Sequence, residues 1–174
     1  MHVGDITDVD FGFTYCPMFN SVKRMQGDMK ELYKLLYTRY EWNDESFDTL
    51  AGWLWNLNLS RKALVSDTFS DLIDNIDNQK YAPYIFVTTC SAGICGLLAM
   101  KVMQYTGTVC LMVTDCDDMY IGSGRIPEWF DRNILQYESV KIDGHANAFG
   151  IRIPKNICDD YFKYLDKVIA EYVS

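Results

Sequence analysis

One segment of the chain combines glycines with an arginine that could bind a phosphate. It reads Gly122-Ser123-Gly124-Arg125 and lies at the end of a predicted strand. Glycines let a backbone approach a ligand closely, and an arginine guanidinium is a two-pronged donor for a phosphate. Glycines also interrupt edge strands, so a ligand site and a break in a strand both stay open here.

A second segment carries a histidine among small residues. It runs from Asp143 to Gly150 and contains Gly144, His145 and Asn147. Little side-chain bulk is available nearby to bury an imidazole ring. We therefore expect the ring of His145 to be presented to a ligand.

A third segment, Ser91–Ala99, joins a predicted strand to a predicted helix and contains Gly93 and Gly96. Free backbone N–H groups at the start of a helix can hold a phosphate. A tight turn between the strand and the helix explains the same glycines without a ligand.

These segments lie in a series of alternating strands and helices that begins after Pro83. We predict strands at Tyr84–Thr89, Thr108–Thr114, Met119–Arg125 and Phe149–Ile153, a turn at Asp115–Asp118, and helices at Ala92–Tyr105, Pro127–Tyr137 and from Asn156 onward. This order is typical of an α/β fold with a mixed sheet and flanking helices.

The N-terminal part of the chain is predicted to be helical after an irregular segment, residues 1–27. Apolar spacing predicts a helix at Asp28–Tyr40 and one long helix from Ser46 to Gln79. We therefore predict two domains, a helical linker region at 1–80 and an α/β substrate-binding domain at 81–174.

The three segments, in this order and at this spacing, resemble the DHH-associated domain of the DHH phosphoesterases, in the RecJ-like branch of single-strand exonucleases. The family's signatures there are a Gly-x-x-Gly-Leu/Ile-x-Ala run, a Gly-Ser-x-Arg strand and a Gly-Gly-His-x-x-Ala-x-Gly segment. The matching runs are Gly93–Ala99, Gly122–Arg125 and Gly144–Gly150, with further similarity at Phe13–Pro17, Asn20, Arg24 and Leu57–Lys62. The chain thus resembles the C-terminal half of such an enzyme, with its preceding helical linker.

The resemblance implies that this chain grips a sugar–phosphate backbone. Arginine and histidine side chains would contact phosphates, asparagine and serine would add hydrogen bonds, and glycines would allow close approach. The binding residues that it implies are Arg125, His145, Gly144, Ser123, Gly122, Gly124, Asn20, Arg24 and Asn147.

The chain departs from the family pattern at four positions. Asp143 replaces the first glycine of the Gly-Gly-His segment, and Phe149 replaces a small residue. Lys23 stands where the family usually has glycine, and Ser91 stands where RecJ proteins often have histidine.

The metal-binding motifs of the family are not found in this sequence. Family members hold manganese or magnesium with aspartates and histidines of an N-terminal domain, and metal-dependent hydrolysis needs such clustered ligands. Neither of the two histidines, His2 and His145, lies in an Asp-His-His triplet, and we expect Asp8 and Asp10 to be solvated. We therefore expect no catalysis by this chain alone, no cofactor in it, and manganese or magnesium in a complementary catalytic half.

Two arrangements fit this pattern, namely one half of a longer exonuclease and a protein that kept only the substrate-binding module. The expected partners are single-stranded nucleic acid and a DHH catalytic domain or another protein. One alternative is an inactive scaffold that docks a protein through Trp42, Phe47, Trp53 and Trp55. Another is a module that binds small nucleotides. Candidates for stacking on bases are Trp53, Trp55 and Trp129.

Composition limits the remaining classes of function. The 174 residues carry a formal net charge of −8, so a nucleic-acid site must be local rather than a general basic field. The six cysteines form no C-x-x-C pair, which favours reduced thiols in the cytoplasm over a zinc site. No run approaches the ~20 apolar residues of a membrane span, and the N-terminus has no signal-peptide pattern.

Overall fold

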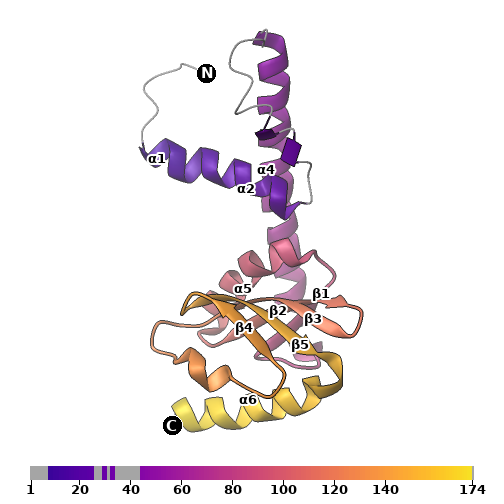
Figure 1. The fold of residues 1–174 in the computed structure, drawn as a ribbon, viewed down its shortest axis with the longest axis vertical. Coiled ribbons are helices and arrows are strands. Elements are labelled where there is room, and N and C mark those ends of the chain that lie inside the picture. Colours follow the sequence, from indigo (N-terminus) through magenta and orange to yellow (C-terminus); the bar gives the residue numbers. More distant parts are fainter. Residues whose placement is uncertain (1–7, 26–28, 31, 34–43, 174) are drawn as a thin grey trace. The chain divides into compact units, whose positions relative to one another are not determined.

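The computed structural model describes residues 8–25, 29–30, 32–33 and 44–173. The chain divides into two compact units, Met1–Ser66 and Asp67–Ser174, and each has its own hydrophobic core (Figure 1). The long helix α4, Asp44–Asp74, contributes residues to both units.

The first unit begins with helical structure. Its first elements are α1 (Asp8–Asp10), a π-helical turn (Phe11–Tyr15) and α2 (Cys16–Arg24). The expectation of an irregular segment is therefore wrong over residues 8–24. Pro17 stands in the first turn of α2, where a residue without an N–H costs no hydrogen bond, so the proline opens the helix instead of breaking it.

The core of the first unit joins α2 to α4. Met18 and Val22, one helical turn apart on α2, are buried together with Leu32 and with Leu54 of α4. Of the helix predicted at 28–40, residues 29, 30, 32 and 33 are helical, and the others lie outside the described residues.

The long helix predicted at Ser46–Gln79 is confirmed as α4, although it ends at Asp74. Asn75 leaves the helical conformation with a φ of −115°, and its side-chain amide donates a 2.9 Å hydrogen bond to the carbonyl of Asp71. Such a local bond from an asparagine competes with helix continuation. A short 3₁₀ turn, Ile76–Asn78, follows.

A five-stranded mixed sheet forms the centre of the second unit, in the order β1-β2-β3-β5-β4. The strands are β1 (Ile85–Thr88), β2 (Cys110–Cys116), β3 (Met119–Arg125), β4 (Lys141–Gly144) and β5 (Ala148–Pro154). β1 and β2 are parallel and are joined through α5 (Ala92–Thr106), whereas all other neighbours are antiparallel. The predicted α/β fold with a mixed sheet and flanking helices is confirmed.

Helices cover the two faces of this sheet. α5 lies on one face, where it contacts β2 and β3, and α6 (Cys158–Val173) lies on the other (Figure 1). Successive residues of a strand point to opposite faces, so alternate positions of β5 enter the core beneath α6. The core residues shared by β5 and α6 include Phe149, Ile151, Ile153, Tyr161 and Leu165.

The segment between β3 and β5 differs from the prediction in two ways. Residues 127–137 form a loop with one 3₁₀ turn, Arg132–Leu135, instead of an α-helix. The apolar residues of this stretch anchor the loop, because Phe130 and Leu135 are buried in the sheet's core. β4 was not predicted, since Ile142 is the one side chain that it packs against that core and no alternating pattern results.

The turn between β2 and β3 is shorter than the predicted Asp115–Asp118. Both strands extend further, and the turn consists of Asp117 and Asp118. Asp117 has a φ of +50°, a left-handed conformation that aspartate tolerates better than most residues.

Candidate nucleic-acid interface

The arginine segment and the histidine segment lie side by side at one end of the sheet. Arg125, the last residue of β3, pairs with Ala148, the first residue of β5. The carbonyl of Ala148 accepts a 3.1 Å hydrogen bond from the N–H of His145, which follows β4. The backbones of Arg125 and His145 are thus about two strand spacings apart, ~10 Å. A further backbone bond, from the N–H of Ile126 to the carbonyl of Asn147 at 3.3 Å, fastens the two segments together.

Gly96 of the third segment completes this arrangement from α5. A Cβ atom built on Gly96 would lie 2.8 Å from a terminal nitrogen of Arg125 and 3.4 Å from the hydroxyl oxygen of Ser123. The glycine therefore leaves room for the Arg125 guanidinium beneath α5, and Arg125 also donates a 2.8 Å hydrogen bond to the carbonyl of Gly124. The three segments singled out in the sequence meet at one place in the second unit.

The start of α5 fits the strand-to-helix junction expected from Ser91–Ala99. Ser91 is the N-cap residue and makes no capping hydrogen bond through its side chain. Its carbonyl accepts a 2.9 Å bond from the N–H of Ile94. Gly96 has a packing role here, and phosphate binding by the start of this helix stays a prediction.

His145 is presented at the tip of the β4–β5 hairpin. Its side chain is exposed, as is the preceding Gly144. Gly144 has a φ of +124°, which L-residues rarely adopt, and a Cβ there would lie 3.2 Å from the Cα of Phe149. Glycine is therefore required for the backbone path that carries the histidine.

Arg132 holds this hairpin tip in place. One terminal nitrogen of its guanidinium donates hydrogen bonds to the carbonyls of Gly144, at 2.8 Å, and His145, at 2.9 Å. Sequence reasoning missed Arg132 because it lies in a stretch predicted to be helical. No spacing relative to His145 indicates such a contact between a loop and a hairpin.

Gly122 and Gly124 are explained by packing within the sheet. A Cβ on Gly122 would overlap the backbone of Met112 on β2, and a Cβ on Gly124 would overlap the ring of Phe149 on β5. These glycines therefore let β3 fit closely between its neighbours. Close approach of a ligand to them stays a prediction.

Asn20 and Arg24 lie in the first unit, on α2, whereas the other predicted site residues lie in the second. Asn20 is exposed and Arg24 is half-buried. The structure therefore gathers the predicted residues of β3 and of the β4–β5 hairpin, and it places these two on a separate unit.

The Asn58 and Arg61 pair of the helical motif makes a buried polar network with α2. Asn58 Oδ1 accepts hydrogen bonds from Ser21 Oγ at 3.1 Å and from an Arg61 terminal nitrogen at 2.9 Å, and Arg61 Nε donates to Ser21 Oγ at 3.0 Å. Burial lowers the pKa of Arg61, and the nearby Arg24 lowers it further. The three-residue spacing puts both side chains on one face of α4, where they fasten α2.

Metal-ligand chemistry is not offered by the part of the chain that the structure describes. Within it, no three His, Cys, Asp or Glu side chains are grouped so that they could hold a metal ion. Asp8 is exposed, as expected. The cysteines are free thiols, and burial raises the pKa of Cys95 to about 12, which keeps that sulfur protonated and unreactive.

The candidate aromatic residues differ in their exposure. Trp53 packs against the core of the first unit, while Trp55 is 44% exposed. Trp129 is 53% exposed and stacks on Tyr172, with ring centroids 6.3 Å apart. Trp42 and the side chain of Phe47 lie outside the described residues.

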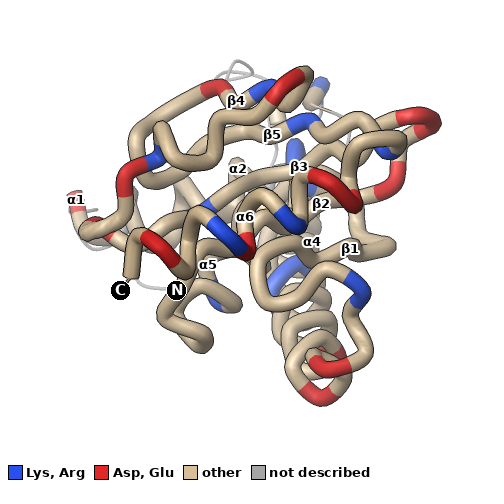
Figure 2. The backbone as a smooth tube through the Cα atoms, turned by 90° about the horizontal axis from the view of Figure 1, so that it is seen from below, with Lys and Arg blue, Asp and Glu red and all other residues tan. Residues whose placement is uncertain are grey.

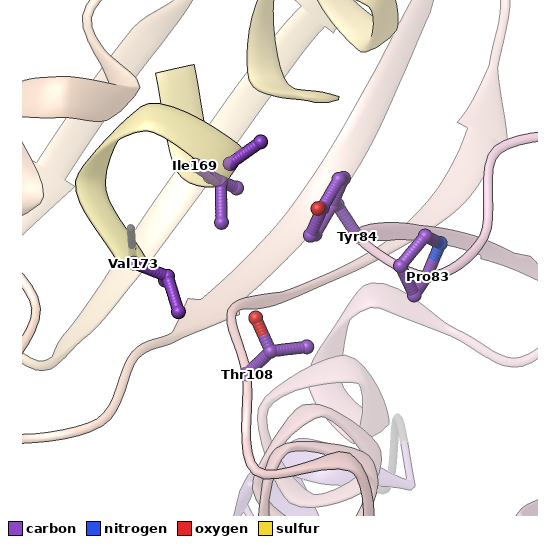
Figure 3. Close-up of a pocket in the computed structure, with 6 residues that line it drawn as sticks. Pro83, Tyr84, Thr108, Ile169 and Val173 are labelled. Atoms are coloured by element: carbon purple, nitrogen blue, oxygen red, sulfur yellow. The ribbon is translucent and has the colours of Figure 1, made fainter. Parts of the chain in front are cut away.

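A pocket of about 370 Å³ lies between the end of α6 and the segments before β1 and β2 (Figure 3). Its lining residues are Pro83, Tyr84, Thr108, Ile169, Ala170 and Val173. None of these side chains is charged, so this pocket does not suit a phosphate.

Among the described helices, none has the length and apolar character needed to cross a membrane.

Solved structures of RecJ share this fold. RecJ from Thermus thermophilus in complex with Mg2+ matches with a TM-score of 0.74 and 17% identity, over 94% of this chain and 26% of that chain. RecJ from the same organism in complex with Mn2+ matches with a TM-score of 0.74 and 18% identity, over 94% and 24%. An exonuclease RecJ bound to manganese matches with a TM-score of 0.69 and 16% identity, over 94% and 42%.

No family model and no curated protein matches the sequence itself. This chain spans about a quarter of the length of the Thermus thermophilus RecJ chains. The resemblance inferred from three short segments is confirmed by the structural matches, and the chain has a RecJ-like fold over 94% of its length.

Proposed function

We propose that this chain binds the sugar–phosphate backbone of single-stranded nucleic acid at the end of its sheet. The observation that carries the proposal is the register that places Arg125 and His145 on either side of Ala148, about two strand spacings apart at one end of the sheet. In this proposal, Arg125 and His145 contact phosphates, Ser123 adds a hydrogen bond, and Gly144 allows close approach.

The proposal assigns the cleavage reaction to a complementary, metal-bearing half. Hydrolysis of a phosphodiester by a metal enzyme requires ligands that hold the ion and activate water. The described residues offer no such group. This chain would then contribute substrate binding to a manganese- or magnesium-dependent single-strand exonuclease, in which Asn20 and Arg24 of α2 would add further contacts.

A binding titration tests the proposal. Labelled single-stranded DNA and RNA are titrated at low salt with wild type, Arg125→Ala/His145→Ala and the control Lys167→Ala, an exposed lysine on α6. We expect the double variant to lose roughly tenfold or more in affinity and to flatten the salt dependence, while the control binds as wild type does. Equal affinity of all three proteins would overturn the proposal.

Docking of a protein partner is the second candidate function. Trp55 and Leu59, one turn apart on α4, are 44% and 45% exposed, so one side of the helix presents apolar surface. Trp55→Ala would then abolish partner capture without changing binding of nucleic acid.

The small-nucleotide alternative predicts that a dinucleotide competes with longer strands at equal concentration.

A further inference from the structure

Two positively charged side chains face each other across strands β4 and β5. Lys141 pairs with Arg152 in the register of these strands, and both residues are exposed. Figure 2 shows Lys and Arg on these two neighbouring strands. Among the described residues, neither side chain has an ion pair or a hydrogen bond. Like charges directly opposite each other on a sheet are destabilising, so this pair needs an explanation outside the sheet.

The pair lies on the same face of the sheet as Arg125. Ile142 and Ile151 pack into the core beneath α6, so the alternating positions, Lys141 and Arg152, point to the other face. α5 makes its sheet contacts with β2 and β3 on that face. The part formed by β4 and β5 is therefore left exposed beside the candidate interface.

On β5, the position between the two positive positions has no side chain. Gly150 lies between Ala148 and Arg152 on β5, is exposed, and has no atom closer than 3.7 Å to the position of a Cβ. Asp143 pairs with Gly150 and is the acidic group on this face of β4 and β5. A bare strip of backbone thus connects the Arg125 end of the sheet with the Lys141 and Arg152 pair.

The length of this strip fits several phosphates. Arg152 follows Ala148 by four residues on β5, which is about 13 Å along a strand. Phosphates recur at about 3.4 Å of axial rise along one strand of stacked DNA, but successive phosphates of that strand are about 6–7 Å apart through space, so the strip spans about two nucleotide steps. A mononucleotide or dinucleotide cannot reach both ends.

We propose that Lys141 and Arg152 form a second phosphate-binding position, so that this face takes a single-stranded oligonucleotide of at least about three nucleotides instead of a small nucleotide. The proposal rests on the proposed function, because the first position is the Arg125 end of the same face. Asp143 lies between the two positions and disfavours a phosphate directly above it, so the backbone of the ligand passes over Gly150.

A series of oligonucleotide lengths tests the proposal. Labelled oligothymidylates of two, four, eight and twelve nucleotides are titrated with wild type, Lys141→Ala/Arg152→Ala and Lys163→Ala/Lys167→Ala. The last variant removes the same charge from exposed positions on α6 and serves as the matched control. The variant Lys141→Arg/Arg152→Lys keeps both charges in place.

We expect Lys141→Ala/Arg152→Ala to lose roughly tenfold in affinity for the eight- and twelve-nucleotide ligands and to bind the dinucleotide as wild type does. The slope of log affinity against log salt should fall by about 1.4, which is 0.7 for each lost phosphate contact. The charge-preserving variant and the α6 control should keep wild-type affinity. Thermal unfolding should show no loss of stability, since the change removes a repulsion.

Other outcomes overturn the proposal in distinguishable ways. An equal loss at every length, or an equal loss in the α6 control, would show a general effect of charge. Unchanged binding of the long ligands by the double alanine variant would show that the pair does not touch the ligand. No binding of any ligand by wild type would overturn the proposed function itself.

Discussion

The ring of Phe149 lies over the bare backbone of Gly124, its partner in the register of β3 and β5. A Cβ on Gly124 would overlap that ring, whose Cδ2 atom lies 2.9 Å from the Cβ position. The large residue at 149 is thus compatible with the fold because position 124 has no side chain. The departure from the family's small residue at 149 fills the core beneath α6.

This contact predicts a strong effect of Gly124→Ala. The added methyl forces Phe149 out of its position in a packed core, and we expect the free energy of unfolding to fall by about 1–3 kcal/mol. Urea denaturation of the variant measures the loss. Gly150→Ala, on the neighbouring strand, should leave the free energy of unfolding nearly unchanged, because the nearest atom lies 3.7 Å from the Cβ position, an ordinary van der Waals contact.

The double variant Gly124→Ala/Phe149→Ala separates the clash from the general effect of each change. Phe149→Ala alone should cost about 3–5 kcal/mol through the cavity that it leaves. The double variant should be less destabilised than the sum of the single changes, because the methyl then has room. Strict additivity would show that residues 124 and 149 do not conflict.

Gly96→Ala should separate ligand binding from stability. Its methyl would stand 2.8 Å from a terminal nitrogen of Arg125, so the guanidinium must move while the rest of α5 is unaffected. Alanine is favoured over glycine within a helix by about 1 kcal/mol, so the free energy of unfolding should not fall. Affinity for single-stranded DNA should fall several-fold in a titration. Gly52→Ala on α4, with no atom within 4 Å of its Cβ position, is the control and should keep full affinity.

The meeting of the three segments could be predicted from the sequence only in part. Each segment is recognisable by its residue types, and the strands that carry Arg125 and Phe149 follow from β-rich composition. Their adjacency depends on β4, whose four residues offer one core-facing side chain, Ile142, and so leave no periodic signal. The contact of Arg132 with the hairpin carbonyls depends on a loop conformation that apolar spacing misrepresents as a helix.

In the first unit, local signals conflicted with packing. A proline after Cys16 suggests a break, yet the same residue is well suited to the first turn of α2. The motif with Asn58 and Arg61 was recognised in the sequence. Its hydrogen bonds to Ser21 could not be predicted, because they depend on the packing of α2 against this part of α4. Sequence patterns thus identified the residues and left their roles to tertiary contacts.

Arg132→Ala should loosen the hairpin that carries His145. The change removes both hydrogen bonds to the hairpin carbonyls, and since the site is open to solvent we expect a loss of about 1 kcal/mol in the free energy of unfolding. Hydrogen exchange at the His145 amide should accelerate, and affinity for single-stranded DNA should fall. Asn133→Ala, which removes an exposed neighbouring side chain, should change neither quantity. Unchanged exchange at His145 in Arg132→Ala would contradict the positioning role.

Asn58→Ala should destabilise the first unit strongly. The change removes the acceptor of a terminal nitrogen of the buried Arg61, whereas Ser21 Oγ keeps its 2.7 Å hydrogen bond to the carbonyl of Pro17. We expect a loss of about 1–3 kcal/mol in the free energy of unfolding, measured by urea denaturation. Asn56→Ala, exposed on the same helix, is the control and should have almost no effect. The loss in Asn58→Ala/Arg61→Ala should be smaller than the sum of the single losses, because the two side chains share one network.

Tyr81 makes stability sensitive to alkaline pH. Burial raises the pKa of its phenol to about 12, and the phenol donates a 2.7 Å hydrogen bond to Asp159. A free tyrosine titrates near 10, so above about pH 10 the unfolded chain loses this proton while the folded chain keeps it. The contribution of Tyr81 is therefore complete below about pH 10 and is lost as pH rises toward 12.

Tyr81→Phe should reduce the fall of the urea midpoint between about pH 10 and 12. The variant lacks one of the phenols that keep their proton in the folded chain and lose it in the unfolded chain over this range. Burial also raises the pKa of Tyr84, so part of the fall should remain. Tyr105→Phe, at an exposed phenol, should follow the wild-type profile. A Tyr81→Phe profile parallel to that of wild type across this range would show that the Tyr81 phenol titrates alike in the folded and unfolded chains.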